Sequence, residues 1–145
     1  MIAPTIDIVA LARLWVGTPY RHRASALGAG CDCLGLLRGV WRSVHGTEPV
    51  ALPPYRASLR DPGNEGTLEA AAMALLVPAG PELASGDVLL FRLNRAAHAR
   101  HCGIATGDGH FIHAQEGLGV VEMALSDGWA KRIVLRRRFF VNEEI

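Results

Sequence analysis

The sequence is poor in cysteine, in aromatic residues and in net charge. Its 145 residues include 3 cysteines, 6% aromatic residues and a formal net charge of +1. An odd and small number of cysteines does not make a disulfide framework. So small a net charge argues against broad electrostatic capture of nucleic acid, and we expect no nucleic-acid partner.

A long hydrophobic run is also absent. The N-terminal segment has no basic stretch, and Asp7 and Arg13 interrupt its apolar residues. We therefore expect neither a signal peptide nor a membrane span. The chain is expected to be made in the cytoplasm, so lysis or a delivery machine would have to carry it to any site of action outside a cell.

What is present is typical of one globular domain. Half of the residues are hydrophobic and 20% are charged, which distinguishes the chain from a disordered one. A chain of 145 residues is long enough to bury a core without disulfides or metals. We expect a single domain over residues 1–145.

Helices are predicted in the first half of the chain and strands in the second. Apolar residues at helical spacing predict helices over residues 5–15, 33–45 and 65–77. Apolar runs between glycine-containing turns predict strands over residues 88–93, 101–106, 110–115, 119–125 and 133–141. The proline-rich residues 47–64 are predicted to be a long surface connection or, equally, an insertion that shapes a cleft. Helices followed by consecutive strands favour an α+β domain with an antiparallel sheet.

A reactive cysteine is predicted at the start of the second helix. Asp32 can cap this helix, and Cys33 stands directly after it. Unpaired backbone N–H groups and the positive end of the helix dipole favour the thiolate of Cys33, which is the nucleophilic form. Two later histidines, His101 and His113, supply a candidate base and a candidate orienting group.

The turn between the two histidine-bearing strands decides whether the histidines can meet. A three-residue loop at residues 107–109 pairs Thr106 with His110. Because side chains alternate along a strand, this register puts His101 and His113 on the same face as diagonal neighbours. A two-residue loop would put them on opposite faces. The catalytic interpretation therefore needs the three-residue register.

The same alternation places Cys102 on the face opposite to His101, where we expect a small buried residue of the core. A zinc site made from Cys31, Cys33, His101 and Cys102 is an alternative. It is disfavoured because Cys102 turns away from His101 and because the sequence has no Cys-x-x-Cys pair. A disulfide between Cys31 and Cys33 would be strained, so Cys31 is expected to pack within its loop or, at most, to sense oxidation.

Five short motifs follow one another along most of the chain. They are Gly17-Thr18-Pro19-Tyr20, Asp32-Cys33-Leu34-Gly35-Leu36, Gly86-Asp87-Val88-Leu89-Leu90-Phe91, His101-Cys102-Gly103-Ile104 and Phe111-Ile112-His113-Ala114. In this order they resemble the NlpC-type cell-wall peptidases, which are papain-like cysteine peptidases that cut peptidoglycan stem peptides. Residues 30–36 are most similar to the members carried by tailed phages and gene transfer agents.

The resemblance implies a papain-like fold, in which the cysteine helix packs on an antiparallel sheet. It implies that Cys33 is the nucleophile, that His101 is the base and that His113 orients His101. The implied reaction is hydrolysis of a peptidoglycan stem peptide, usually between D-γ-glutamate and a diamino acid. Neither a metal nor an organic cofactor is expected.

Four other residues are candidates for substrate contacts. Tyr20 resembles the family tyrosine beside the nucleophile, and Asp32 resembles the acidic residue that helps to hold the substrate amine. Leu34 stands where the family commonly has serine, which removes a hydroxyl from one wall of the cleft. Arg21 stands where the family often has glycine; it could meet a stem-peptide carboxylate or be an ordinary solvated loop charge.

Two other functions stay open. The papain-like scaffold also supports amidases and acyltransferases, and Leu34 could signal a different substrate. A non-catalytic tail-hub protein that binds the wall or other proteins could keep the same fold. The expected partners are the stem peptide and phage-like tail proteins.

The arginines at residues 136–138 are expected to lie at a sheet edge, where they would add charge to the edge and make protein contacts.

Overall fold

The computed structural model describes residues 6–47, 66–93 and 98–140. The helices are α1 Ile8–Arg13, α2 Cys33–His45, α3 Thr67–Leu75 and α4 Asp127–Ala130. The strands are β1 Ser25–Ala26, β2 Gly30–Cys31, β3 Val77–Pro78, β4 Val88–Phe91, β5 His101–Ala105, β6 His110–Gln115, β7 Gly119–Ala124 and β8 Ile133–Arg138. Within these described ranges, no helix is long and apolar enough to cross a bilayer. The connection predicted over residues 47–64 lies almost wholly outside them.

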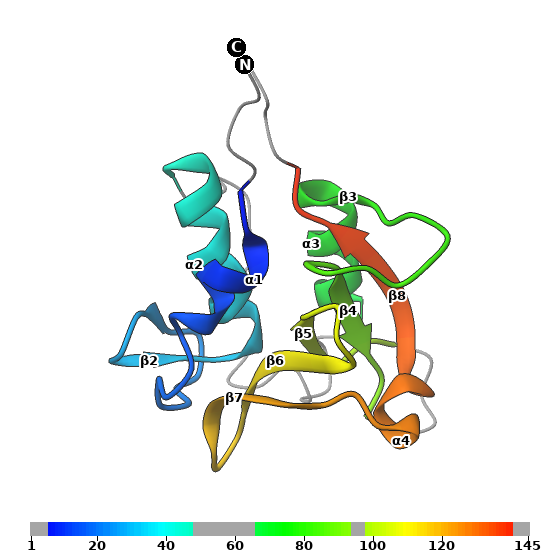
Figure 1. Cartoon of the computed structure of the whole chain (residues 1–145). Helices are drawn as coiled ribbons and strands as arrows, with labels where there is room; N and C mark the ends of the chain where they lie inside the picture. Colours follow the sequence, from blue (N-terminus) through cyan, green and yellow to red (C-terminus); the bar gives the residue numbers. More distant parts are fainter. Residues whose placement is uncertain (1–5, 48–65, 94–97, 141–145) are drawn as a thin grey trace.

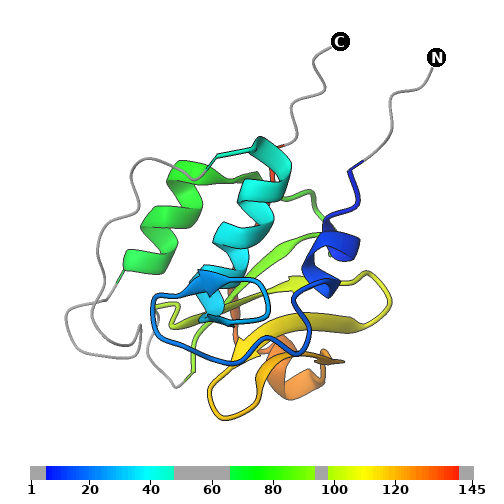
Figure 2. The same ribbon diagram turned by 90° about the vertical axis from the view of Figure 1, so that its left-hand side faces the viewer.

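The strands form one six-stranded antiparallel sheet and a separate two-stranded hairpin. The order in the larger sheet is β3-β8-β4-β5-β6-β7, and β1 pairs with β2. Figure 2 shows α3, α2 and α1 side by side in front of the sheet. Figure 1 shows α4 on the opposite side of the molecule from α2, with the central strands between them. The predicted α+β architecture with an antiparallel sheet is confirmed.

Local signals set both ends of α2. The side chain of Asp32 accepts a hydrogen bond from the backbone N–H of Gly35 at 2.7 Å and caps the first turn. Gly46 ends the helix in the left-handed conformation at φ 81°. A Cβ on Gly39 would lie 2.0 Å from the Trp15 ring, so this glycine lets the segment after α1 pack closely against α2.

The two faces of the sheet carry different cores. Strand β4 shows the division, because Val88 and Leu90 pack with the residues of α2 whereas Leu89 and Phe91 pack on the other face. The core on the α2 side is mainly aliphatic and includes Cys33 and Cys102. The core on the α4 side is built around the rings of Phe91, Phe111 and the half-buried Trp129.

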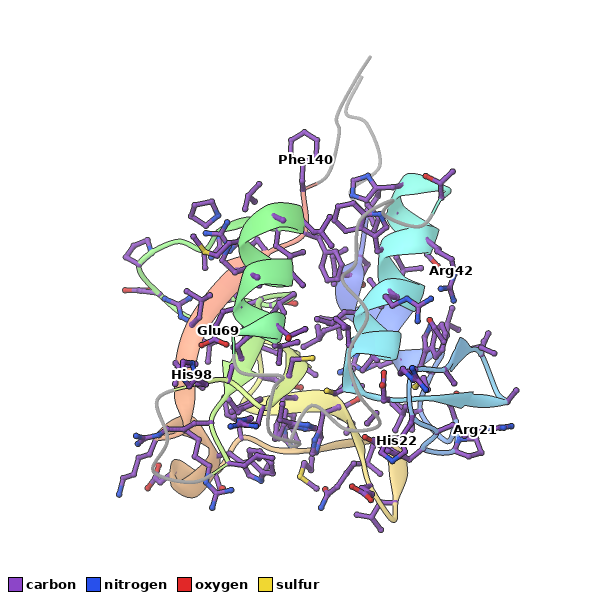
Figure 3. All side chains as sticks on the ribbon, turned by 180° about the vertical axis from the view of Figure 1, so that it is seen from behind. Arg21, His22, Arg42, Glu69, His98 and Phe140 are labelled. Carbon is purple, nitrogen blue, oxygen red and sulfur yellow. The ribbon has the colours of Figure 1, made fainter. Side chains whose placement is uncertain are left out.

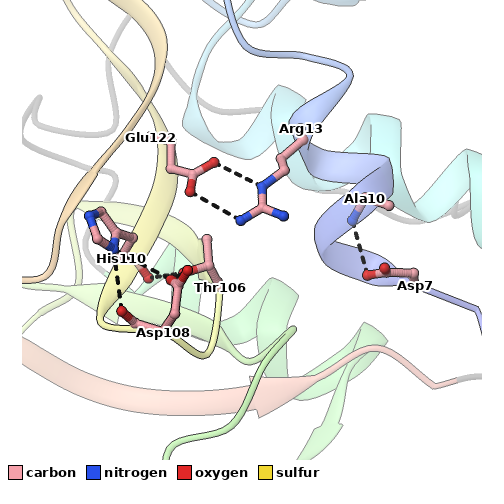
Figure 4. Close-up of polar contacts among 7 residues, drawn as sticks. All are labelled: Asp7, Ala10, Arg13, Thr106, Asp108, His110 and Glu122. Carbon is pink, nitrogen blue, oxygen red and sulfur yellow. Dashed lines mark hydrogen bonds and ion pairs between the residues drawn. The ribbon is translucent and has the colours of Figure 1, made fainter.

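An exposed ion pair joins α1 to β7. Arg13 donates from Nε and Nη2 to the two carboxylate oxygens of Glu122, at 2.9 and 3.1 Å (Figure 4). Asp7 caps α1 by accepting the backbone N–H of Ala10 at 3.0 Å. The contact with Glu122 connects a helix on one layer to the edge strand of the sheet.

The prediction that residues 136–138 lie at a sheet edge is wrong. Strand β8 lies between β3 and β4, and its covering strand β3 has only two residues, which left too short a pattern in the sequence. Arg136 and Arg138 donate to the fully buried Asp87 at 2.8 and 2.7 Å. Arg137 is buried and donates to the carbonyl of Leu76 at 2.7 Å. Arg136 and Arg138 therefore hold Asp87, which directly precedes β4, and Arg137 holds the end of α3.

Candidate active site

The first residue of α2 is Cys33, which is 4% exposed and belongs to the core on the α2 side. Its pKa is lowered to about 5. The largest cause is a hydrogen bond from the thiol of Cys102, and the hydrogen bond and positive charge of His101 act in the same direction. Burial and the charge of Asp32 oppose them. The sulfur is thus a thiolate near neutral pH.

The β5–β6 hairpin has the register that the sequence predicts. Ile104 pairs with Ile112 and Ala105 with Phe111, and the N–H of Thr106 donates to the carbonyl of His110 at 2.9 Å. Oγ1 of Thr106 also lies within hydrogen-bond distance of the Asp108 carboxylate and of the His110 carbonyl, and its single hydrogen can be donated to either (Figure 4). Gly109 has a φ of +88°, as the three-residue loop requires.

This register brings the two predicted histidines together. Nε2 of His101 lies 2.7 Å from Nδ1 of His113. The two rings are nearly perpendicular, at 81°, with centroids 4.9 Å apart. A Cβ on Gly103 would lie 3.1 Å from Cβ of His113 and 2.9 Å from the carbonyl oxygen of Ile112. Glycine at this position therefore leaves the space that the histidine pair occupies.

His113 is held neutral by its surroundings. It is 0% exposed, and burial, followed by the charge of His101, lowers its pKa to about 3. A neutral imidazole has one nitrogen that accepts and one that donates. Nδ1 of His113 can therefore accept the Nε2–H of His101 when His101 is protonated.

The buried position of Cys102 was predicted, but its contact with Cys33 was not. Cys102 is fully buried in the core on the α2 side, which confirms its predicted place. Its pKa is raised well above the ordinary value by burial and then by its contact with Cys33, so it stays a thiol and donates to the Cys33 sulfur. Sequence reasoning missed this bond, although alternation along β5 already put Cys102 on the face that α2 covers.

The carboxylate of Asp32 joins two backbone segments beside Cys33. Asp32 is 3% exposed. One carboxylate oxygen accepts the N–H of Gly35 and the other accepts the N–H of Arg23, both at 2.7 Å. Arg23 has a φ of 59°, which a non-glycine residue rarely adopts. Asp32 thus ties the preceding loop to the first turn of α2, and its contact with a substrate amine stays a prediction.

The other predicted contact residues lie around the first turn of α2. Tyr20 is half-buried, forms a bridge with Cys31 and packs on the core. Arg21 is exposed on the same loop (Figure 3). Leu34 is 4% exposed and lines an apolar hollow between α2 and α3. Their contacts with substrate stay predictions. In residues 6–47, 66–93 and 98–140, no cluster of three or more His, Cys, Asp or Glu side chains is arranged to hold a metal.

Comparisons with known proteins agree with this architecture. Residues 17–138 match the profile of the NlpC/P60 family. A probable endopeptidase NlpC homolog of Haemophilus influenzae is 30% identical over 125 residues, which are 86% of this chain and 57% of that protein. A murein DD-endopeptidase MepS/murein LD-carboxypeptidase of Escherichia coli K12 is 31% identical over the same shares. The chain thus spans a little more than half the length of these curated relatives.

The crystal structure of the NlpC/p60 domain of the peptidoglycan hydrolase SagA has the same fold. It superposes with a TM-score of 0.60 at 25% identity, and the match covers 92% of this chain and 97% of that one. The papain-like fold that the five motifs imply is thereby confirmed.

Proposed function

Because the chain belongs to the NlpC/P60 family, we propose that it is a cysteine endopeptidase that hydrolyses peptidoglycan stem peptides. One observation carries the proposal. A cysteine begins a helix, and its pKa is lowered to about 5 by Cys102 and by His101; Nε2 of His101 lies 2.7 Å from Nδ1 of a second, buried histidine. This is the arrangement of nucleophile, base and orienting group that acyl transfer needs.

In the first half of the proposed reaction, the Cys33 thiolate attacks the carbonyl carbon of the scissile amide. The carbonyl oxygen becomes an oxyanion, for which the backbone N–H of Cys33 and the Tyr20 hydroxyl are the proposed donors. Protonated His101 gives its proton to the leaving amine as the C–N bond breaks. A thioester between Cys33 and the acyl part of the stem peptide remains.

In the second half, His101 takes a proton from water, and the resulting hydroxide attacks the thioester carbonyl. The C–S bond breaks, the product leaves as a carboxylic acid and Cys33 returns to the thiolate. Nδ1 of neutral His113 accepts from His101 whenever His101 is protonated, so the same ring orientation serves both halves. The proposed roles need no metal and no organic cofactor.

The proposed scissile bond joins D-γ-glutamate to a diamino acid, which is the usual bond of the family that the motifs resemble. Asp32 and Arg21 are the proposed partners of the amine and of a carboxylate in the stem peptide. The name of the Escherichia coli relative concerns DD-endopeptidase and LD-carboxypeptidase activities. The products must therefore be identified by mass, because each of these three bonds gives a different fragment.

The decisive experiment is a digest of purified peptidoglycan with the wild-type protein, Cys33→Ala and Cys31→Ser, followed by mass spectrometry of the released fragments. We expect release by the wild type and by Cys31→Ser, and none by Cys33→Ala. Undiminished release by Cys33→Ala would refute the nucleophile assignment. Transfer of the acyl group to an added amine would indicate an acyltransferase, and absence of any release would favour the non-catalytic tail-hub protein.

We further propose that the protein acts with a phage-like tail that must pierce a cell wall, and that lysis or such a particle carries it to the wall. The support is the similarity of residues 30–36 to members carried by tailed phages and gene transfer agents. Immunoblots of purified particles from the producing cells test this association. Protein found only in the particle-free fraction would contradict it without affecting the proposed hydrolysis.

A further inference from the structure

Among the residues that the structure describes, one buried ring nitrogen of the histidine pair has no hydrogen-bond partner. His113 is 0% exposed, and its Nδ1 contacts Nε2 of His101. Its other nitrogen, Nε2, is buried and has no hydrogen-bond partner among the residues that the structure describes. A buried polar atom without a partner is costly, so its surroundings call for a physical explanation.

The state of the pair that the proposed reaction needs places a proton on that same nitrogen. When His101 is protonated, both of its ring nitrogens carry hydrogen, and its Nε2–H points to Nδ1 of His113. Nδ1 of His113 must then be free of hydrogen. Because His113 stays neutral, its single N–H lies at Nε2. The competent tautomer therefore directs an N–H into the aromatic core on the α4 side.

The rings around His113 differ in what they can offer this N–H. The Phe111 ring stacks on His113 at 4.3 Å with an interplanar angle of 24°. In that arrangement it covers a face of the imidazole and does not meet an N–H that lies in the imidazole plane. The Trp129 ring lies at 5.3 Å and 70°. In such an edge-to-face pair, an in-plane N–H of one ring can point at the π-face of the other.

Trp129 is held where it can act on both histidines. Trp129 belongs to the short helix α4, which Ser126 caps: its hydroxyl oxygen accepts the backbone N–H of Trp129 at 3.4 Å. Its ring also lies 5.8 Å from the His101 ring at 40°. The guanidinium of Arg132 lies 5.4 Å from the Trp129 ring centroid. Trp129 is half-buried, and its ring is in contact with the rings of both histidines.

We propose that Trp129 is a positioning residue for the histidine pair, whose indole ring accepts the Nε2–H of His113. This inference rests on the proposed roles of Cys33, His101 and His113. The ring acceptor stabilises the tautomer in which Nδ1 of His113 accepts from His101, and its cover keeps water away from that hydrogen bond. Trp129 does not touch the reacting sulfur; it acts through His113.

The first test reads the tautomer of His113 directly, by ¹⁵N NMR of histidine-labelled protein near neutral pH without substrate. Trp129→Leu keeps an apolar side chain and removes the ring, whereas Trp129→Phe keeps a ring. We expect the Nε2–H tautomer to dominate in the wild type and in Trp129→Phe, and a mixture of tautomers in Trp129→Leu. An unchanged tautomer in folded Trp129→Leu overturns the inference, and so does a Trp129→Phe protein that behaves like Trp129→Leu.

The second test measures how fast iodoacetamide alkylates Cys33 at a pH near its pKa of about 5, with the modified peptide identified by mass spectrometry. Loss of an N–H···π contact should slow this alkylation roughly threefold in Trp129→Leu. Trp41→Leu is the matched control, because Trp41 is also half-buried but lies on α2 against His45. The control should alkylate at the wild-type rate, and an equal loss in both variants overturns the inference.

A third variant avoids any doubt about folding. A tryptophan with several fluorines on its ring is a weaker π-acceptor than a phenyl ring and differs little from tryptophan in shape. The chain has 3 tryptophans, so the substitution is made in the wild type and in Trp129→Phe. Fluorination should shift the tautomer balance and slow alkylation in the wild type only. An equal response in both proteins, or none, overturns the inference.

These measurements use no peptidoglycan, so they separate the two proposals. If the tautomer and the alkylation rate respond while no peptidoglycan fragment is released, the proposed function fails and the role of Trp129 stands. If fragments are released while both readouts are unmoved in Trp129→Leu, the role of Trp129 fails and the proposed function stands.

Discussion

The two faces of the sheet supply different chemical groups to the Cys33 sulfur. On the α2 side, an aliphatic core surrounds the Cys33 sulfur and supplies the Cys102 thiol as a hydrogen-bond donor. On the α4 side, an aromatic core surrounds His101 and His113. The first face supplies a neutral, buried donor, and the second supplies a group that can carry and move a proton. A strand that alternates its side chains can present both, through the adjacent residues His101 and Cys102.

The largest expected effect on activity comes from removing the imidazole of His101, on the face with the aromatic core. His101→Ala removes the proposed general base and acid, so the rate of fragment release from peptidoglycan should fall roughly 10²–10⁴-fold. The control is His98→Ala, because His98 is an exposed histidine near Glu69. Equal activity of the two variants would show that His101 takes no part in proton transfer.

The next expected effect is a loss of stability in acid, which follows from the burial of His113. Its pKa is about 3 in the folded chain and 6.5 in the ordinary state, so the unfolded chain binds more protons between these values. The contribution of neutral His113 to the free energy of unfolding is therefore fully present above about pH 6.5, and it is lost as the pH falls toward 3. At about pH 4 this loss amounts to no more than about 3 kcal/mol.

His113→Asn should remove this part of the pH dependence. Urea unfolding near neutral pH and near pH 4 measures it, with His110→Asn as the control, because His110 is exposed on the same strand. A wild-type protein that loses no more stability in acid than His113→Asn would contradict the buried, neutral state of His113.

The aliphatic side is tested by Cys102→Val, which keeps a buried apolar side chain and removes the S–H donor. The pKa of Cys33 should rise from about 5, by roughly one unit. The pH dependence of iodoacetamide alkylation measures the shift: reaction slows as the pH falls through the pKa, because the thiolate is lost. Cys102→Ser keeps a donor and should leave the profile near that of the wild type. Identical profiles for Val and Ser would exclude a role for the donor.

The smallest expected effect lies away from both cores. The Arg13–Glu122 ion pair is exposed, with side-chain exposures of 48% and 27%. Arg13→Ala should therefore leave the unfolding midpoints nearly unchanged, because an exposed ion pair contributes little to stability. Thermal and urea unfolding measure them. A large fall in either midpoint would mean that the α1–β7 contact stabilises the fold more than an exposed ion pair should.

Much of the site followed from local patterns. The bounds of α2 were predicted to the residue, because Asp32 and Gly46 are strong cap signals that act within one turn. The histidine pair followed from the loop at residues 107–109, because a hairpin loop of known length sets the register of every residue beyond it. The catalytic roles of these residues stay predictions until the variants are measured.

Other features left no such pattern. The strand β3 has two residues, and α4 has four, which is too short for a periodicity to be read. The arginines of β8 looked like edge charges because the sequence does not show which strand lies beside them. Trp129 lies 16 residues beyond His113, and nothing in that spacing indicates that the two rings meet.

By itself, the sequence determined where α2 begins, which residues of the β5–β6 hairpin share a face and which family the chain resembles. These depend on hydrogen bonds and alternation between residues close along the chain. Only the tertiary structure decided that Cys102 donates to Cys33, that Asp87 binds two arginines and that the Trp129 ring lies against both histidines. Each of these contacts depends on how α2, α4 and the sheet pack together, and packing brings side chains together without regard to their separation in sequence.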